Sequence, residues 1–154
     1  MKMRRSIFMT LLVCGIVADV HAQLRTRVQV SGFTLPVAFV QDPADRRIQV
    51  VVQQDGHIRL VWDASVQPAD FLDLSSEVSA GAEQGLLGLA FAPNVATSGR
   101  FFVNFTNREG HTVVARFRRS SDPARADATS RFDLRWGGGN GPAFISQPYA
   151  NHNG

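Results

Sequence analysis

The chain has 154 residues, 16 of them Lys or Arg and 13 Asp or Glu, so its formal net charge is +3 at pH 7. Residues 1–22 hold three of the basic residues and one acidic residue, which leaves 13 Arg against 12 acidic residues and a net charge of +1 beyond residue 22. This balance gives no reason to expect nucleic acid as a partner. The absence of Lys after Lys2 excludes lysine Schiff-base chemistry there, and the single cysteine, Cys14, excludes disulfides.

The first 22 residues have the pattern of a secretory signal peptide. Lys2, Arg4 and Arg5 precede an apolar run over residues 7–17, and Val20-His21-Ala22 forms a small-residue exit. We expect cleavage after Ala22, with Ala18 as the second choice. A retained membrane anchor is the alternative, but the apolar run is shorter than the roughly 20 residues that span a bilayer. The mature chain is therefore expected to be periplasmic or secreted, with no membrane attachment.

A first β-hairpin is predicted around Asp55-Gly56. Gly tolerates positive φ and Asp bonds its own backbone, so this pair suits a tight turn between two strands of alternating pattern. The residues expected on one face are Ile48, Val50 and Val52 before the turn, and Ile58, Leu60 and Trp62 after it. Both faces carry apolar groups, which favours a sheet covered on both sides.

A second hairpin repeats the design about 50 residues later, with its turn at residues 107–110. In its first strand Phe101, Val103 and Phe105 alternate with Phe102, Asn104 and Thr106, and in its second Val113, Ala115 and Phe117 share a face. A repeat of about 50 residues built from about four short strands is the signature of a β-propeller blade. We predict an all-β fold with two to three blades; a β-sandwich with two similar hairpins is the alternative.

The residues between the hairpins resemble a known family. They read Glu83-Gln84-Gly85-Leu86-Leu87-Gly88-Leu89-Ala90-Phe91-Ala92-Pro93, similar to a run in the early blades of soluble glucose/sorbosone dehydrogenases. Further landmarks follow the family's order: Leu35-Pro36 opening a strand, Asp45-Arg46, Gly56-His57-Ile58-Arg59, Arg125-Ala126-Asp127 in a loop, and the final segment 147–154. The resemblance spans nearly all of residues 23–154 and implies the N-terminal two to three blades of a six-bladed propeller that is truncated at its C-terminal end.

The resemblance also implies a function. In that family, aldose sugars are oxidised at the anomeric carbon to a lactone by hydride transfer to pyrroloquinoline quinone (PQQ), with Ca²⁺ beside it. By position, His152 would be the general base, while Gln84 and Asn151 would bind the sugar. Asn151 stands where some relatives have an acidic residue. No cofactor-binding residue is assigned, no metal site is predicted within residues 1–154, and the ligands of Ca²⁺ are expected beyond Gly154.

Two other functions stay open on the sequence alone. One is a secreted propeller that binds carbohydrate or protein without redox chemistry, and the other is a truncated product whose open strand edge and uncovered face favour aggregation. Two local expectations accompany these. His57 and His111, which each follow a turn glycine, are expected at exposed strand starts, and residues 86–91 are expected to form a buried inner strand.

Overall fold

The structure is a computed structural model that describes residues 24–79 and 81–151. The signal peptide predicted at residues 1–22 and the predicted base His152 therefore lie outside the described residues. The regular elements of the described chain are β-strands, apart from one short helix, α1 (Val95–Ser98). The all-β prediction is confirmed.

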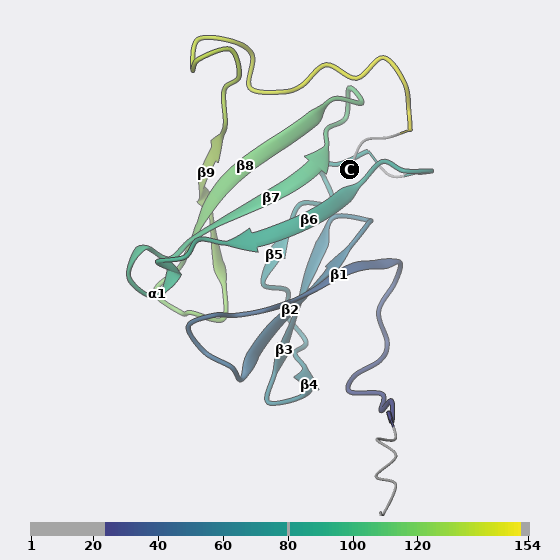
Figure 1. Cartoon of the computed structure of the whole chain (residues 1–154), viewed down its shortest axis with the longest axis vertical. Coiled ribbons are helices and arrows are strands. Elements are labelled where there is room, and N and C mark those ends of the chain that lie inside the picture. The colour runs from purple at the N-terminus through teal and green to yellow at the C-terminus, as the bar shows by residue number, and fades with distance from the viewer. Residues whose placement is uncertain (1–23, 80, 152–154) are drawn as a thin grey trace, which may run out of the picture.

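Two antiparallel sheets make up the fold (Figure 1). The first has the strand order β1-β2-β3-β4, with β5 also paired to β3, and the second has the order β6-β7-β8-β9. The strands of the first sheet are β1 (Pro36–Gln41), β2 (Ile48–Gln53), β3 (His57–Trp62), β4 (Ser65–Val66) and β5 (Leu72–Asp73). Those of the second are β6 (Leu86–Phe91), β7 (Arg100–Thr106), β8 (Thr112–Arg119) and β9 (Ala126–Asp133). Each sheet is a meander of sequential neighbours, as in a propeller blade.

Both predicted hairpins are present. In the first, Val50 is opposite Leu60 and Val52 is opposite Ile58; in the second, Val103 is opposite Ala115. The first turn closes with a hydrogen bond from the N–H of Gly56, at φ +105°, to the carbonyl of Gln53. A Cβ on Gly56 would lie 2.6 Å from the backbone of Ser75, so the turn also needs glycine for space.

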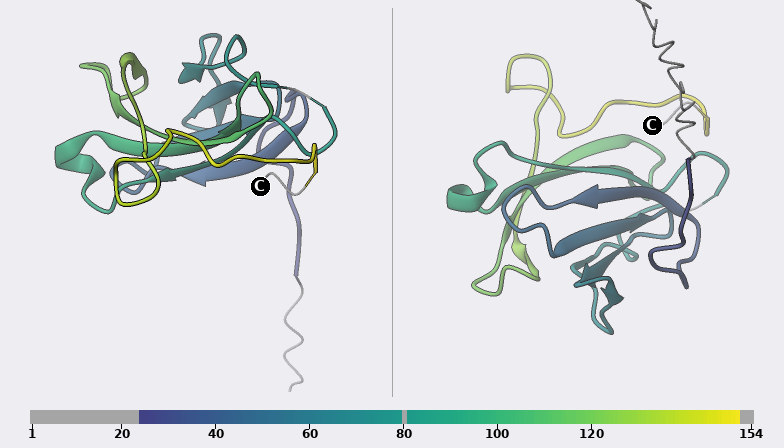
Figure 2. Two further views of the ribbon diagram at one scale, coloured as in Figure 1. Left: turned by 90° about the horizontal axis from the view of Figure 1, so that it is seen from above. Right: turned by 60° about the horizontal axis from the view of Figure 1, so that its bottom comes forward.

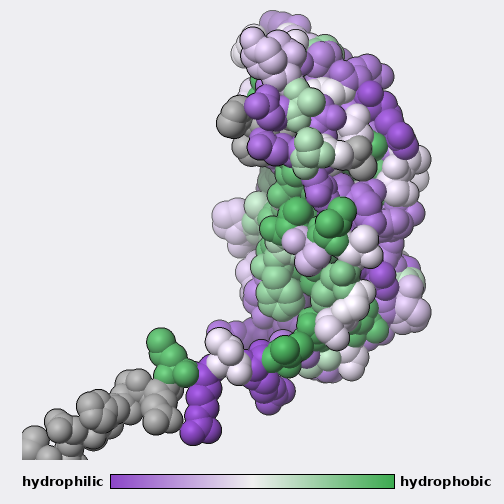
Figure 3. Space-filling view, turned by 90° about the vertical axis from the view of Figure 1, so that its right-hand side faces the viewer, coloured by the Kyte–Doolittle hydropathy of each residue, from purple (hydrophilic) through white to green (hydrophobic). Residues whose placement is uncertain are grey.

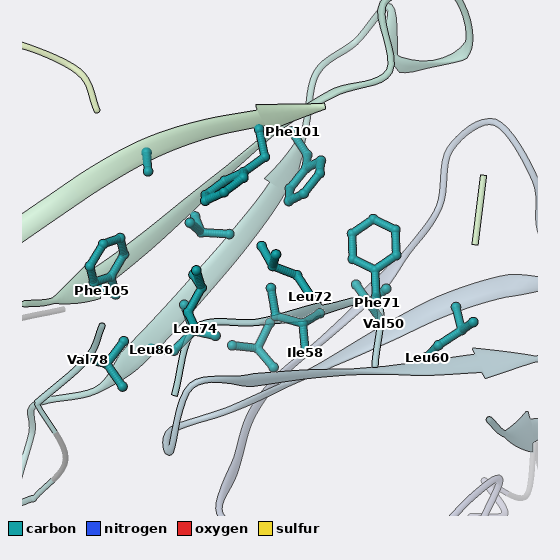
Figure 4. Packing of buried hydrophobic residues seen from close by; sticks show 14 of the residues in the cluster. Val50, Ile58, Leu60, Phe71, Leu72, Leu74, Val78, Leu86, Phe101 and Phe105 are labelled. Atoms are coloured by element: carbon teal, nitrogen blue, oxygen red, sulfur yellow. The ribbon is translucent and has the colours of Figure 1, made fainter. Parts of the chain in front are cut away.

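The core lies between the two sheets, where their inward faces meet (Figure 4). Phe71, from the loop that precedes β5, lies 5.1 Å from Phe101 between ring centroids, and Phe101 stacks on Phe117 at 5.7 Å. Burying one such ring contributes roughly 1.5–3 kcal/mol. The other fully buried members include Ile48, Val50, Val52, Ile58, Leu86, Val103 and Phe105.

A buried ion pair also joins the sheets. Arg119, at the end of β8, donates to the carboxylate of Asp42 in the β1–β2 turn at 2.5 Å, and the side chains are 9% and 0% exposed. The guanidinium lies over the ring of Phe91, 4.9 Å from its centroid. The two sheets are therefore joined by a buried ion pair as well as by an apolar core.

The edge strands are less covered than predicted. In β6 only Leu86 is buried and Ala90 is exposed, so the expectation of a buried inner strand over residues 86–91 is wrong. The reason is its place: β6 has a hydrogen-bonded neighbour, β7, on one side only. In β1, Val37 and Phe39 are exposed, and the expected cover on both faces is incomplete there. Residues Ala126 and Asp127, predicted in a loop, begin β9 instead, where Ala126 pairs with Arg119.

Candidate functional site

The loop that carries Gln84 is the best-defined part of the predicted site. The N–H of Gln84 donates to the carbonyl of Gly81 at 2.9 Å, which closes a tight turn just before β6. Gly85 follows at φ +142°, and a Cβ there would overlap the carbonyl oxygen of Gln54 in the β2–β3 turn. The glycine at this position is therefore required by a close approach of two backbones.

Gln54 also holds this loop through its side chain. Its Nε2 donates to the carbonyls of Ala82 and Gln84, at 2.8 Å each, and its own carbonyl accepts the N–H of Leu86 at 2.9 Å. The N–H of Thr106, at the end of β7, donates to the carbonyl of Gly85 at 2.8 Å. The Gln84 loop is thus fixed from both sheets at once.

The side chain of Gln84 reaches the β7–β8 turn. It is half-buried, and its Nε2 would lie 3.4 Å from a Cβ on Gly110. Because glycine has no side chain, the amide of Gln84 can lie close to the backbone of Gly110 in this turn.

The C-terminal segment reaches the same turn from the other direction. Ile145 exchanges both backbone hydrogen bonds with Thr112, and the ring of Phe144 stacks on His111 with 4.6 Å between centroids. The N–H of Gln147 donates to Nδ1 of His111 at 3.3 Å. In Figure 1 this yellow segment crosses from β9 to the end of the second sheet where β6 begins, and Figure 2 shows the same approach from above.

The structure therefore brings Gln84 and residues 144–147 together at one end of the second sheet. Asn151 is exposed a few residues further along, and His152 lies outside the described residues. His111, expected at an exposed strand start, is instead half-buried and anchors the segment that leads to both. Sequence reasoning missed this role because the partners of His111 lie more than 30 residues away along the chain.

His57 was also expected to be exposed, and it too is half-buried with partners. Its Nδ1 is hydrogen-bonded to Asp70 at 2.7 Å and lies 3.7 Å from Asp73. The hydrogen bond with Asp70 raises the pKa of His57 above its usual value, burial opposes this rise, and the charges of Asp73 and Asp55 add to it. Because Arg59 binds the other oxygen of Asp70 at 2.8 Å, the cluster is already charge-paired.

These three groups, His57, Asp70 and Asp73, have ligand atoms close enough together to hold a metal ion, a possibility that the sequence prediction of no metal site did not consider. The cluster lies on β3, β5 and the loop before β5, in the first sheet. It belongs to a different sheet from the Gln84 loop.

The residues of the predicted site do not fit PQQ, a tricarboxylate, by themselves. Among the described residues at this end of the second sheet, the cation of the β7–β8 turn is Arg108, and its guanidinium donates to the carbonyls of Ser75 and Ser76. The other polar side chains here are amides, an imidazole, a hydroxyl and the carboxylates of Glu83 and Glu109, which suit sugar hydroxyls better than the carboxylates of PQQ. No cofactor-binding step is assigned to them.

A separate apolar groove of about 440 Å³ lies on the outer face of the first sheet. Its walls include Phe33, Val37 and Phe39, the last of which is 57% exposed. Figure 3 shows hydrophobic surface gathered in the middle of this side of the molecule. Within the described residues, no helix has the length and apolar character needed to cross a membrane.

Comparison with solved structures gives the class of the fold. The chain is similar to a glucose dehydrogenase-type oxidoreductase of Thermus thermophilus, with 24% identity and a TM-score of 0.58 over 77% of this chain. It is also similar to the PQQ-bound aldose sugar dehydrogenase of Streptomyces coelicolor, with 21% identity and a TM-score of 0.54 over 71% of this chain. These neighbours are propeller-type dehydrogenases, so the blade prediction is favoured over the sandwich.

A further glucose dehydrogenase structure matches at 25% identity and a TM-score of 0.50 over 62% of the chain. The predicted resemblance to the soluble sugar dehydrogenases is therefore confirmed. The chain spans 35%, 34% and 28% of the lengths of these three structures, about a third.

The curated relatives that match the chain bear a different name from these dehydrogenases. The chain is 26% identical over 99 residues to mouse hedgehog-interacting protein and 26% identical over 90 residues to the human protein. These matches cover 61% and 55% of this chain but only 14% and 13% of the two relatives. No protein-family model matches the chain.

Proposed function

We propose that the chain is the N-terminal part of a six-bladed, PQQ-dependent sugar dehydrogenase that oxidises an aldose at the anomeric carbon to a lactone. After loss of the signal peptide 1–22, the protein is periplasmic or secreted. One observation carries the proposal: the Gln84 loop and the segment that leads to Asn151 and His152 converge on the β7–β8 turn, in a fold similar to glucose dehydrogenases.

Each proposed residue has a role suited to its chemistry. Gln84 and Asn151 carry amides that both donate and accept, so they bind the hydroxyls of the sugar. His152 accepts the hydroxyl proton as hydride leaves the anomeric carbon, because an imidazole with a pKa near 6.5 is a competent base near neutral pH. PQQ, when bound, supplies the electron-accepting chemistry. None of Gln84, Asn151 and His152 is assigned as a ligand of PQQ or of Ca²⁺.

The test begins with the intact mass of the native protein from its source. A mass far above the 16.9 kDa of this chain supports a complete propeller. The protein is then loaded with PQQ and Ca²⁺ and assayed with an artificial electron acceptor and a panel of aldoses. We expect His152→Asn to lower kcat by about 10²- to 10⁴-fold, the usual contribution of a general base. Loaded native protein that oxidises no aldose would overturn the proposal.

A second candidate is a secreted propeller that binds protein or carbohydrate without redox chemistry. The similarity to hedgehog-interacting protein favours it, since that relative is named for a protein partner. Titration with PQQ in the presence of Ca²⁺ separates the two candidates: a dehydrogenase binds the quinone stoichiometrically, whereas a binding module does not. A native mass that matches residues 23–154 favours the third possibility, a truncated product that is inactive by itself.

A further inference from the structure

We infer that Gln54, which lies in the β2–β3 turn of the first sheet and outside the predicted site, is a positioning residue for the substrate-binding side chain of Gln84. The inference rests on the proposed function. The side-chain amide of Gln54 has two N–H donors, and they meet the carbonyls of Ala82 and Gln84 at 2.8 Å each. A single side chain thus holds both ends of the Ala82–Gln84 loop.

The loop needs this support because its backbone is strained. Ala82 has a positive φ of +50°, and the glycines that flank the loop, Gly81 and Gly85, lie at +139° and +142°. A non-glycine residue in the left-handed region costs about 1–3 kcal/mol and persists only where its surroundings hold it. The two hydrogen bonds from Gln54, together with its carbonyl bonded to Leu86, are the observed restraints from the first sheet.

The hydrogen bonds of Gln54 directly restrain the residue that carries the substrate-binding amide, Gln84. The carbonyl that Gln54 holds belongs to Gln84 itself, and the amide of Gln84 lies against Gly110 on the opposite side. A shift of the loop therefore changes where this amide points, and a misplacement of about 1 Å is enough to weaken a substrate contact severely. Gln54 acts without touching the sugar.

The decisive variant is Gln54→Glu, which keeps the shape of the side chain but removes both donors. In the native protein loaded with PQQ and Ca²⁺, we expect KM for the aldose to rise about tenfold, the effect of losing one hydrogen bond between the displaced Gln84 amide and the sugar, while kcat changes less than about twofold. The matched control is Gln41→Glu. Gln41 also donates to backbone carbonyls, including that of Ile48 at 2.8 Å, but in the β1–β2 turn.

A double-mutant cycle separates positioning from a merely structural role. Because Gln54 acts through Gln84, the KM effect of Gln54→Glu should disappear when Gln84 is already Ala. A general loss of structure would persist in that background and would appear in both the melting temperature and kcat. An undiminished KM effect in the Gln84→Ala background would overturn the inference.

The positioning role of Gln54 can also be tested without any enzymatic activity. If the native protein oxidises no aldose, the side-chain amide resonances of Gln84 in ¹⁵N-labelled protein still report its position. We expect Gln54→Glu to shift and broaden them and Gln41→Glu to leave them in place. Resonances that are the same in both variants would overturn the positioning role independently of any activity.

Discussion

The two sheets have the same meander, and in each a histidine follows the glycine of the central hairpin, yet the two histidines do different work. His57 in the first sheet is hydrogen-bonded to Asp70, with which it forms an ion pair when protonated. His111 in the second stacks on Phe144 and accepts a hydrogen bond from Gln147. At equivalent positions of the two sheets, His57 thus makes a contact within its own sheet, whereas His111 holds the C-terminal segment that leads to the predicted site. In this repeated fold, the connecting segments rather than the strands distinguish the sheets.

The largest expected effect comes from breaking the buried ion pair between the two sheets. Asp42→Ala leaves the buried Arg119 without its partner, and breaking a buried pair in this way costs about 3–5 kcal/mol. We expect a corresponding fall in the free energy of unfolding measured by urea denaturation. The control is Asp45→Ala, which removes an exposed pair with Arg47 from the same β1–β2 turn. Equal losses in the two variants would show that the inter-sheet pair contributes nothing beyond a surface pair.

The second effect concerns the contact between the Gln84 loop and the first sheet. Gly85 and Gly81 have nearly the same φ, but a Cβ on Gly85 overlaps the carbonyl of Gln54, whereas a Cβ on Gly81 meets nothing within 4 Å. Both alanine variants bear the backbone strain, and only Gly85→Ala adds the collision. We expect Gly85→Ala to be less stable than Gly81→Ala by about 1–3 kcal/mol in the same denaturation experiment. Two variants of equal stability would contradict this close approach.

The strands were predictable because their information is local. The alternation that pairs Val50 with Leu60 and Val103 with Ala115 is written in adjacent residues, and Asp55-Gly56 marks its own turn. The exposure of β6 was not predictable in this way. The run over residues 86–91 is as apolar as a central strand, and only the sheet order places it at an edge.

The site was predictable only in its residue types. The resemblance pointed to Gln84, but the residue that holds its loop, Gln54, lies 30 positions earlier, and nothing in its own neighbourhood marks it. The same holds for His111, whose bond to Gln147 spans 36 positions. Local patterns carry no signal for such pairings, since these depend on how two sheets and a returning segment meet in space.

A third, smaller effect tests the anchor in the second sheet. Phe144→Ala removes the ring that stacks on His111, and such a pair contributes about 0.5–1.5 kcal/mol. The N–H of Ile145, bonded to Thr112, should then exchange with solvent about 2- to 12-fold faster. Tyr149→Ala is the control, because Tyr149 is exposed in the same segment. If Ile145 exchanges equally fast in both variants, the stack does not hold the segment.

The smallest effect concerns the ion pair in the first sheet and its dependence on pH. Because the hydrogen bond with Asp70 raises the pKa of His57, the pair's contribution is fully present below the pKa of the unfolded state and is lost as pH rises through the higher folded value. His57→Gln should therefore lower the free energy of unfolding near pH 5.5 by about 0.2–1 kcal/mol, as for other partly exposed pairs, and by less near pH 9. Asp70→Asn removes the main partner and should reduce the same pH dependence, while the charges of Asp73 and Asp55 remain. An equal loss of stability in His57→Gln at both pH values would show that the pair contributes through shape and packing rather than through charge. The two histidines would then differ in their partners but not in the kind of interaction that stabilises each sheet.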